Sequence, residues 1–414
     1  MKVLFLSLSS LPHLSEHSIS LDLLHKFVRN KHSVYVVCSN ERRNNQPTMI
    51  SKEAGCHIIR VRTGNLTKCN IVEKGLATLS LPIQYKIAIK KYLSKVKFDL
   101  VLYPTPPVTQ YHTVKYIKRR DGAKTYLLLK DIFPQNAVDI GMLKKRGLKG
   151  SLYKYFRNIE KKLYDVSDKI GCMSKANVDY LCKHNPRVPK EKVEVCPNSI
   201  EVVDMSLSKS EKNEIRKKYK LPIDKTIFIY GGNLGKPQGI DFLVKCLESQ
   251  KSNEEVFFLI IGSGTEYGKI EKYVQNKDVH NVRLVKRLEK EEYDKIVASC
   301  DVGLIFLDHR FTIPNFPSRL LSYMQAKIPV LAVTDPNTDI GKIIMEGEFG
   351  WWCESNNSHN FEQLINMACN SERISMGEKA YQFMLQNYTV ESAYNIIMQM
   401  YDNIEDKINE NITN

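Results

Sequence analysis

"FIYGGNLGKPQGIDFL" stands at residues 228–243, just past the middle of a chain of 414 residues. An apolar, β-prone run enters a turn with three glycines, and a segment with helical spacing follows. Glycines let a backbone approach an anion closely, and the N-terminus of a helix adds positive potential. The spacing is neither the dinucleotide fingerprint nor a Walker A loop. Two interpretations stay open: a phosphate-binding turn, or a tight turn that needs glycine for steric reasons.

The same alternation of short apolar runs and amphipathic segments fills both halves of the chain. It predicts strands at 3–8, 33–38, 57–62, 100–103, 125–129, 169–173 and 193–196, and then at 226–230, 256–261, 282–285, 302–306 and 330–333. The alternation stops at the polar stretch 201–222. We predict two doubly wound α/β domains, 1–200 and 201–385, and a C-terminal helix with a polar tail, 386–414, that can cross back to the first domain. Ligands of such sheets bind beyond the carboxyl ends of the strands, which points to the cleft between the domains.

Charge is distributed unevenly along the chain. Residues 1–200 contain 36 Lys and Arg against 15 Asp and Glu, and the rest contains 25 against 31, so a half of charge +21 precedes a half of charge −6. Such a field favours an anionic membrane or another polyanion as partner of the first half, with a solvated basic surface as the alternative. The basic residues do not interleave with aromatic ones, which argues against nucleic acid. Ten dispersed cysteines are typical of reduced thiols in a cytosolic protein.

Two further turns in the second half resemble the first in their chemistry. "IIGSGTE" (260–266) ends a strand with two glycines, and "NFPSRLLSYMQAKIPVLAVTD" (315–335) places Ser and Arg at the start of a helix. Three strand ends that tolerate an anion predict a site for a nucleoside diphosphate. The candidate donor-binding residues are Gly231, Gly232, Gly235, Lys236, Gly262, Gly264, Phe316, Pro317, Ser318 and Arg319.

The second half resembles the C-terminal domain of the family 4 retaining glycosyltransferases, which have the GT-B fold. The matching segments are "YGGNLGKPQGID", "IIGSGTE", "ASCDVGLIF" and "PSRLLSYMQAKIPVLAV". In the first half, "YLLLKDIFPQNAVDIGML" resembles bacterial transferases of the fucosamine-transferase-like group, which act in O-antigen synthesis. "RNIEKKLYDVSDKIGCMSKA" and "KVEVCPNSIEV" resemble the same group near its domain boundary. The resemblance covers roughly residues 1–400.

The resemblance assigns roles to further positions. The family's two glutamates correspond to Pro314 and Ser322, and its diphosphate-binding Arg and Lys correspond to Asn233 and Gln238. We therefore add Asn233, Gln238 and Ser322 to the donor-binding candidates. Lys236 and Arg319 become the candidates for stabilising charge on the departing diphosphate. The resemblance also implies transfer with retention of configuration and without a bound metal or cofactor, and the sequence shows no Asp-x-Asp motif and no cluster with ligand spacing.

The acceptor side is predicted at strand ends of the N-terminal half. Asp131 follows the strand 125–129, where its carboxylate can accept a hydrogen bond from an acceptor hydroxyl, or can cap a turn before Pro134. Lys130 beside it is expected to keep Asp131 ionised or to face the diphosphate. His17 lies in the first predicted βα loop and is the acceptor-side histidine candidate, with an ordinary surface histidine as the alternative.

A basic amphipathic segment, "IQYKIAIKKYLSKVK" (83–97), favours attachment to a membrane surface. Ile83, Ile87 and Leu93 are predicted to share one face flanked by lysines, with a helix that packs on the core as the alternative. The N-terminal apolar run reads as a strand rather than a signal peptide, and no apolar run approaches the length of a membrane-spanning helix.

Together these features predict a retaining glycosyltransferase of bacterial O-antigen or capsule assembly. It would move a sugar from a nucleoside diphosphate, with UDP favoured, to a polyprenyl-diphosphate-linked saccharide, in the cytoplasm at the inner face of the plasma membrane. The alternatives are a nucleotide-sugar epimerase or soluble small-molecule glycosyltransferase of the same fold, and a non-catalytic basic scaffold or nucleic-acid-binding protein.

Overall fold

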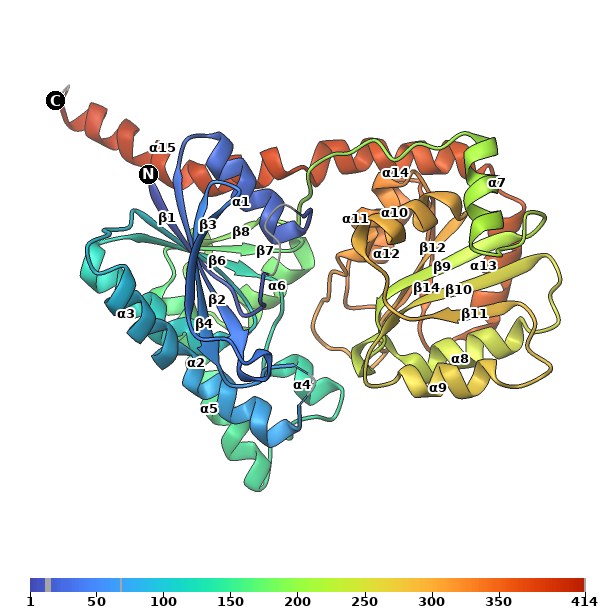
Figure 1. The fold of residues 1–414 in the computed structure, drawn as a ribbon, viewed down its shortest axis with the longest axis horizontal. Coiled ribbons are helices and arrows are strands. Elements are labelled where there is room, and N and C mark those ends of the chain that lie inside the picture. Colours follow the sequence, from blue (N-terminus) through green and yellow to red (C-terminus); the bar gives the residue numbers. More distant parts are fainter. Residues whose placement is uncertain (12–15, 68, 413–414) are drawn as a thin grey trace. The chain divides into compact units, whose positions relative to one another are not determined.

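The computed structural model describes residues 1–11, 16–67 and 69–412. The chain divides into two compact units. Unit 1 comprises Met1–Glu201 and Val390–Asn414, and unit 2 comprises Val202–Thr389 (Figure 1). Each unit has its own sheet and its own hydrophobic core.

Unit 1 contains an eight-stranded sheet of order β3-β4-β2-β1-β5-β6-β7-β8. All neighbouring strands are parallel except β3 and β4. The strand bounds are β1 Lys2–Leu6, β2 Ser33–Glu41, β3 Met49–Glu53, β4 Cys56–Thr63, β5 Leu100–Pro104, β6 Lys124–Leu129, β7 Lys169–Cys172 and β8 Val193–Val195. The sequence pattern missed β3, because this edge strand is mostly exposed and carries no buried alternation. Ala54 and Gly55, both at positive φ, form the tight turn that makes the β3–β4 pair antiparallel.

The helices of unit 1 cover both faces of this sheet. They are α1 Ile19–Arg29, α2 Ile71–Tyr92, α3 Tyr111–Asp121, α4 Gln135–Asp139, α5 Leu148–Val166, α6 Lys175–His184 and α15 Val390–Ile412. α1 and α15 pack together on one face, where Val390, Ala393 and Ile397 enter the core beside Leu24 and Phe27. α2, α3 and α5 lie side by side on the other face (Figure 1). The last helix of the chain therefore completes the core of the first unit.

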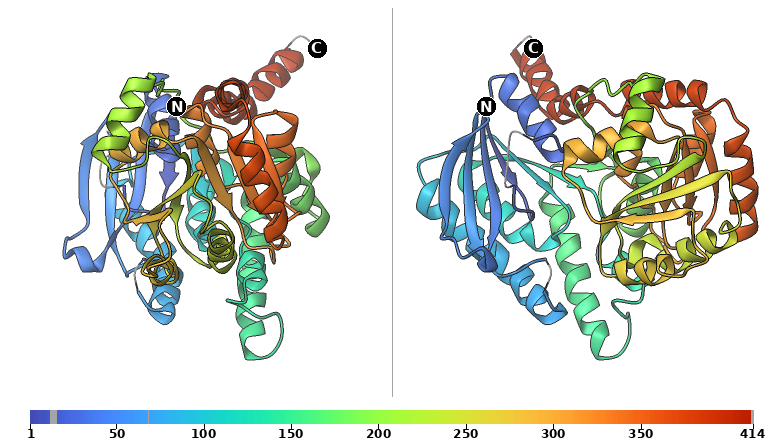
Figure 2. Two further views of the ribbon diagram at one scale, coloured as in Figure 1. Left: turned by 90° about the vertical axis from the view of Figure 1, so that its right-hand side faces the viewer. Right: turned by 45° about the vertical axis from the view of Figure 1, so that its right-hand side comes forward.

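Unit 2 contains a six-stranded parallel sheet of order β11-β10-β9-β12-β13-β14. The strands are β9 Thr226–Asn233, β10 Val256–Ser263, β11 Val282–Val285, β12 Val302–Phe306, β13 Val330–Thr334 and β14 Gly350–Glu354. The helices are α7 Lys209–Lys218, α8 Ile240–Ser249, α9 Tyr267–Val274, α10 Lys290–Ser299, α11 Arg319–Gln325, α12 Ile340–Glu346, α13 Ser358–Cys369 and α14 Arg373–Asn387. Helices cover both faces of this sheet (Figure 2), with α8, α9 and α13 packed against the same core.

The predicted fold of two doubly wound α/β domains is confirmed. The pattern also missed β14, and it placed the end of β9 three residues too early, at Tyr230 instead of Asn233. β9 continues because Gly231, Gly232 and Asn233 remain in register with Ile261, Gly262 and Ser263 of β10. Gly231 and Gly232 of the "GGNLG" segment therefore belong to a strand, so part of their backbone is engaged in pairing with β10.

Candidate functional site

The glycines at the carboxyl edge of the unit 2 sheet allow two loops to touch. A Cβ on Gly262 would lie 2.0 Å from the carbonyl oxygen of Gly232, and a Cβ on Gly264 would lie 2.3 Å from that of Leu234. Backbone atoms cannot move aside as a flexible side chain can. The glycines that follow β10 are thus required by the close approach of the loop that follows β9.

Several amides of the "GGNLG" segment are engaged within unit 2. The Gly231 amide donates to the hydroxyl oxygen of Tyr323 at 3.1 Å, and the Gly235 amide donates to Oε1 of Gln238 at 3.2 Å. The Leu234 amide donates to the Ser263 carbonyl at 2.9 Å. A 3₁₀ turn, η4 (Lys236–Gln238), separates the segment from α8. The segment therefore offers fewer free amides to an anion than the sequence pattern suggests.

Arg319 is a charged group that aromatic side chains surround at this edge of the sheet. It is the first residue of α11, and its guanidinium carbon lies 4.2 Å from the centre of the Tyr230 ring. Burial acts to lower the pKa of Arg319, but the neighbouring hydroxyls of Tyr230, Tyr323 and Tyr293 outweigh it and raise that pKa. The charged guanidinium therefore lies among aromatic side chains that come from β9, α10 and α11.

Three side-chain atoms at this edge are buried and have no hydrogen-bond partner among the residues that the structure describes: Nδ2 of Asn315, Nη1 of Arg319 and Oδ2 of Asp335. Buried polar atoms in folded proteins are nearly always paired, so unpaired ones call for an explanation. Asn315 and Arg319 flank the start of α11, and Asp335 directly follows β13. Burial raises the pKa of Asp335 to about 6. Two donors and one acceptor thus remain without a partner among the described residues at this edge of the sheet.

The other predicted donor residues differ in accessibility. Lys236 and Ser318 are exposed, and Pro317 and Ser322 are half-buried. Phe316 is buried, with its ring 5.9 Å from that of Tyr388. Asn233 donates through Nδ2 to Oε1 of Gln238 at 3.0 Å, so these two side chains pair with each other.

The carboxyl edge of the unit 1 sheet places Lys130 and Asp131 directly after β6. Thr105, at the end of β5, holds the Asp131 backbone from both sides: its hydroxyl donates to the Asp131 carbonyl at 2.9 Å and accepts from the Asp131 amide at 3.2 Å. Oδ1 of Asp131 accepts from Nδ2 of Asn136 at 2.6 Å. α4 begins at Gln135 with Pro134 at its N-cap, so Asp131 is not the cap of that helix.

Burial shifts both of these ionisable groups toward their neutral forms. It raises the pKa of Asp131 to about 6 and lowers the pKa of Lys130 to about 8. The cost of burying the carboxylate dominates the shift of Asp131, and Lys130 is not among its causes, so the expectation that Lys130 holds Asp131 ionised stays a prediction. Lys130 lines a small cavity together with Asn198, whose buried Oδ1 has no partner among the described residues.

His17 pairs with a buried carboxylate. Its Nδ1 lies 3.0 Å from Oδ1 of Asp22, which is 2% exposed, while the His17 side chain is 56% exposed. The second oxygen of Asp22 accepts from the Glu201 amide at 2.9 Å. Asp22 thus fixes the histidine through one ring nitrogen, while more than half of the His17 side chain stays exposed.

The sequence interpretation overlooked the residues that support these groups. Tyr230, Tyr293 and Tyr323 surround Arg319, and Thr105 and Asn136 hold Asp131. Tyr230 and Tyr323 lay inside quoted motifs, whereas Tyr293 and Thr105 carried no local signal. Within the described ranges, no group of three His, Cys, Asp or Glu residues could hold a metal ion. None of the helices described combines the length and the apolar character needed to cross a bilayer.

Comparison with known proteins identifies the class of protein that has two such Rossmann-like units. Residues 211–383 match the family model Glycosyl transferases group 1. The fold is GT-B, and the chain is a glycosyltransferase, which favours an enzyme over the basic scaffold considered above.

Named relatives agree with this class. The chain is 26% identical over 323 residues to the probable glycosyltransferase WbjE of Pseudomonas aeruginosa, covering 78% of each chain. It is 19% identical to the putative colanic acid biosynthesis glycosyl transferase WcaI of Escherichia coli strain K12, covering 60% of each. Among solved structures, Anabaena HepE in complex with UDP-glucose superposes with a TM-score of 0.71 at 14% identity, covering 97% of this chain and 100% of that one.

Proposed function

We propose that this glycosyltransferase moves a sugar from a nucleoside diphosphate to a polyprenyl-diphosphate-linked saccharide in the assembly of a bacterial O-antigen or capsule. Transfer would retain the configuration of the sugar, as the family 4 resemblance implies. The observation that carries the proposal is the buried Nη1 of Arg319, which has no partner among the described residues and lies at the carboxyl edge of unit 2, inside the segment that matches the glycosyltransferase family. UDP is the favoured nucleotide, because a neighbour of the same fold was solved with UDP-glucose.

Unit 2 supplies the groups that the donor needs. A departing nucleoside diphosphate gains negative charge, and a charged donor fixed in advance stabilises that charge without reorganisation. Nη1 of Arg319 is such a donor, and the exposed Lys236 adds a second, mobile cation. Asn315 and Asp335 offer a donor and an acceptor for the ribose or the base, in place of the glutamate that Ser322 replaces.

Unit 1 supplies the groups for the acceptor. With a pKa of about 6, Asp131 is mostly ionised at neutral pH and can accept the proton or hydrogen bond of an acceptor hydroxyl. Lys130, with a pKa of about 8, is mostly protonated at the same pH and can bind a phosphate of the carrier lipid. His17, held by Asp22, is a further acceptor-side group.

The place of action is the inner face of the plasma membrane, to which the protein attaches peripherally. The charge of +21 in residues 1–200 supports this, because an anionic leaflet attracts each nearby Lys or Arg by about 1 kcal/mol. The relative named for colanic acid biosynthesis supports the assignment to surface polysaccharide assembly. No metal or cofactor is part of the proposal.

The proposal is tested with a panel of UDP-, GDP-, dTDP- and CMP-sugars. We expect one nucleotide class, UDP first, to raise the melting temperature of the protein, and duplex or single-stranded DNA to leave it unchanged. The sugar that gives the largest shift is then offered with a lipid-diphosphate saccharide, and transfer is measured as label in the organic-solvent extract. A melting temperature that no nucleotide sugar changes would refute the donor assignment, and label found only in water-soluble products would refute the lipid acceptor.

A further inference from the structure

The outer face of α2 carries a continuous apolar stripe. Five large apolar side chains of this helix are exposed, by 39–72%, and follow one another at intervals of four, three, four and four residues: Val72, Leu76, Leu79, Ile83 and Ile87. These intervals place all five on one side of a helix. At 1.5 Å per residue the stripe extends over about 22 Å. Leu93, which the sequence placed on the same face, is buried and lies beyond the helix.

The opposite side of α2 already supplies the contact with the core. Ala77, Leu81, Tyr85, Ala88 and Ile89 are at most 4% exposed. A surface helix of a soluble protein normally turns a polar face to water, and a helix that is apolar on both sides belongs in a core or at a membrane. An exposed apolar stripe of this length marks an interaction surface.

Lysines continue the stripe at its C-terminal end. Lys90 and Lys91 are exposed, and Lys86 is half-buried. Nζ of Lys86 and Nζ of Lys90 lie 5.0 Å and 5.5 Å from the centre of the Tyr116 ring on α3. The cations of α2 are thus directed along the surface toward the neighbouring helix.

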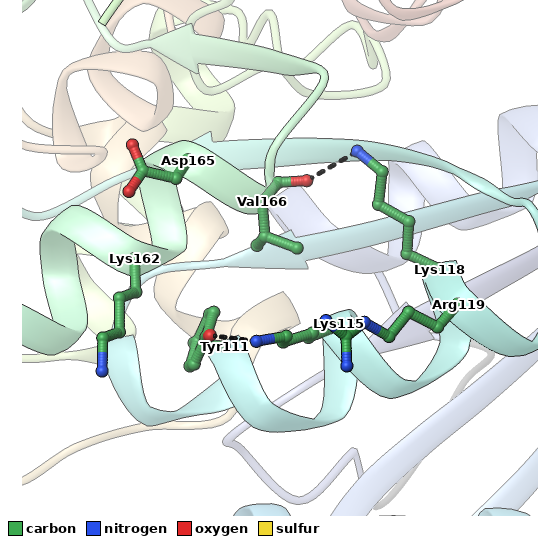
Figure 3. Close-up of a pocket in the computed structure, with 7 residues that line it drawn as sticks. All are labelled: Tyr111, Lys115, Lys118, Arg119, Lys162, Asp165 and Val166. Carbon is green, nitrogen blue, oxygen red and sulfur yellow. Dashed lines mark hydrogen bonds between the residues drawn. The ribbon is translucent and has the colours of Figure 1, made fainter. Parts of the chain in front are cut away.

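A basic groove lies between α3 and α5, with a volume of about 390 Å³ (Figure 3). Lys118 is engaged there with the Val166 carbonyl and with Asp168, and Lys115 donates to the Tyr111 hydroxyl at 2.9 Å. Besides Lys118, the cations that line the groove are Lys115, Arg119 and Lys162. None of these three forms an ion pair with a carboxylate among the described residues. Asp165 also lines the groove, but the four cations outnumber this one carboxylate, so the groove has room and net positive charge for an anionic group.

The cations of the three helices form one surface. His112, exposed on α3, has its pKa lowered first by burial and then by Lys162, Lys115 and Lys86. These lysines come from α5, α3 and α2, so one imidazole lies within electrostatic reach of all three helices. The apolar stripe and the basic groove are parts of the same layer, on the side of the unit 1 sheet away from α1 and α15.

We propose that the α2–α3–α5 layer is the face with which the protein lies on an anionic bilayer: the α2 stripe enters the interface, and the groove between α3 and α5 takes a lipid phosphate. This deepens the membrane attachment in the proposed function by naming the face and adding a hydrophobic component to it. Charge complementarity favours a lipid surface over a second copy of the chain, because a two-fold contact through this face would bring its lysines toward their own symmetry mates.

The test uses the full chain and vesicles of phosphatidylcholine with or without phosphatidylglycerol, at low and high salt. Three triple variants are compared with the wild type. The stripe variant combines Leu76→Ser, Ile83→Ser and Ile87→Ser. The groove variant combines Lys115→Gln, Arg119→Gln and Lys162→Gln. The charge control combines Lys2→Gln, Lys31→Gln and Lys52→Gln, which remove three exposed charges from outside the layer.

The wild type should bind anionic vesicles and should keep part of that binding at high salt, because only its electrostatic part is screened. The affinity of the stripe variant for anionic vesicles should be lower than that of the wild type by a factor of roughly ten or more. At high salt its remaining binding should be lost. The groove variant should lose on the order of 100-fold at low salt, and the charge control should lose far less. The further variant Ile374→Ser, which removes an apolar side chain that is 90% exposed in unit 2, should bind like the wild type.

Equal binding by the stripe variant and the wild type would overturn the inference, as would equal losses in the groove variant and the charge control. A wild-type dimer in light scattering that the stripe variant turns into a monomer would assign the face to a second copy instead. The nucleotide-sugar shift of each variant separates this inference from the proposed function. If vesicle binding follows the pattern above while no nucleotide sugar stabilises even the wild type, the face stands and the donor assignment fails.

Discussion

Replacing Arg319 with methionine should weaken donor binding without weakening the fold. Methionine keeps the length and the apolar stem of the side chain and removes the guanidinium, whose buried Nη1 has no partner among the described residues. An arginine that is fully paired would respond differently, because its removal leaves the partner groups unsatisfied. The two effects of Arg319→Met, on stability and on affinity, can therefore be separated.

The effect on stability follows from three terms, of which one is destabilising and two are stabilising. Loss of the cation–π contact with Tyr230, at 4.2 Å, costs about 0.5–2 kcal/mol, and a methionine sulfur on the same ring restores about 0.3–1.5 kcal/mol. Removal of an unsatisfied buried donor returns about 1–3 kcal/mol. The middles of these ranges sum to a gain, so Arg319→Met should be about 1–2 kcal/mol more stable than the wild type, and its melting temperature should not fall.

The effect on affinity is a loss. A hydrogen bond from a charged group to a phosphate contributes about 1.5–3 kcal/mol, so the dissociation constant of the nucleotide sugar should rise about 10- to 150-fold. Calorimetric titration measures that constant, and denaturant unfolding measures stability. Transfer should slow as well, because the same charge stabilises the departing diphosphate.

Arg216→Met is the matched control. Arg216 is a buried arginine of the same unit, and it is paired with the Ser299 carbonyl and with Asp301, each at 2.8 Å. Its removal leaves Oδ1 of Asp301 without its cation, although Oδ2 still accepts from the Ile227 amide, and should cost about 3–5 kcal/mol while leaving donor affinity unchanged. A loss of stability in Arg319→Met as large as that in Arg216→Met, or an unchanged dissociation constant, would refute the assignment of Arg319 as a preformed phosphate donor.

Two further perturbations address other parts of the site. Because the folded pKa of Asp131 is about 6, above its usual 3.8, the native state holds a proton that the unfolded chain releases, so this group makes stability fall as pH rises from 4 to 6. Asp131→Asn, whose side chain can still accept from Asn136, should remove this dependence of stability on pH and should raise stability by up to about 3 kcal/mol above pH 7. The variant should bind the donor normally and lose most transfer activity. A pH dependence equal to that of the wild type, or undiminished transfer, would contradict this. Gly264→Ala, whose Cβ would lie 2.3 Å from the Leu234 carbonyl oxygen, should destabilise the protein by about 1–3 kcal/mol and weaken donor binding. Gly268→Ala, in α9 with nothing near the added Cβ, should instead stabilise it by about 0.5–1 kcal/mol, and equal behaviour of the two in denaturant unfolding would show that the close loop contact is not a constraint.

The fold could be predicted from the sequence because its signal is local. Each buried parallel strand is a short apolar run, such as Val302–Phe306, and each helix that follows has apolar residues at helical spacing. The turn glycines and the residues after β6 could be named for the same reason, since strand ends in such a sheet all lie at one edge. The edge strand β3 and the terminal strand β14 escaped because one is largely exposed and the other follows a short helix with little pattern of its own.

Tertiary structure alone decided what those residues meet. Tyr230, Tyr293 and Tyr323 are up to 93 positions apart, and only folding brings them around one guanidinium. The shifted pKa of Asp131 comes from burial by remote segments and not from its neighbour Lys130. On α2, the sequence shows apolar residues on two sides, but only the packed structure tells which side the sheet covers and which five side chains remain in water. Hydrophobic period encodes the element and its apolar positions, whereas the partner of each position depends on contacts that no local pattern contains.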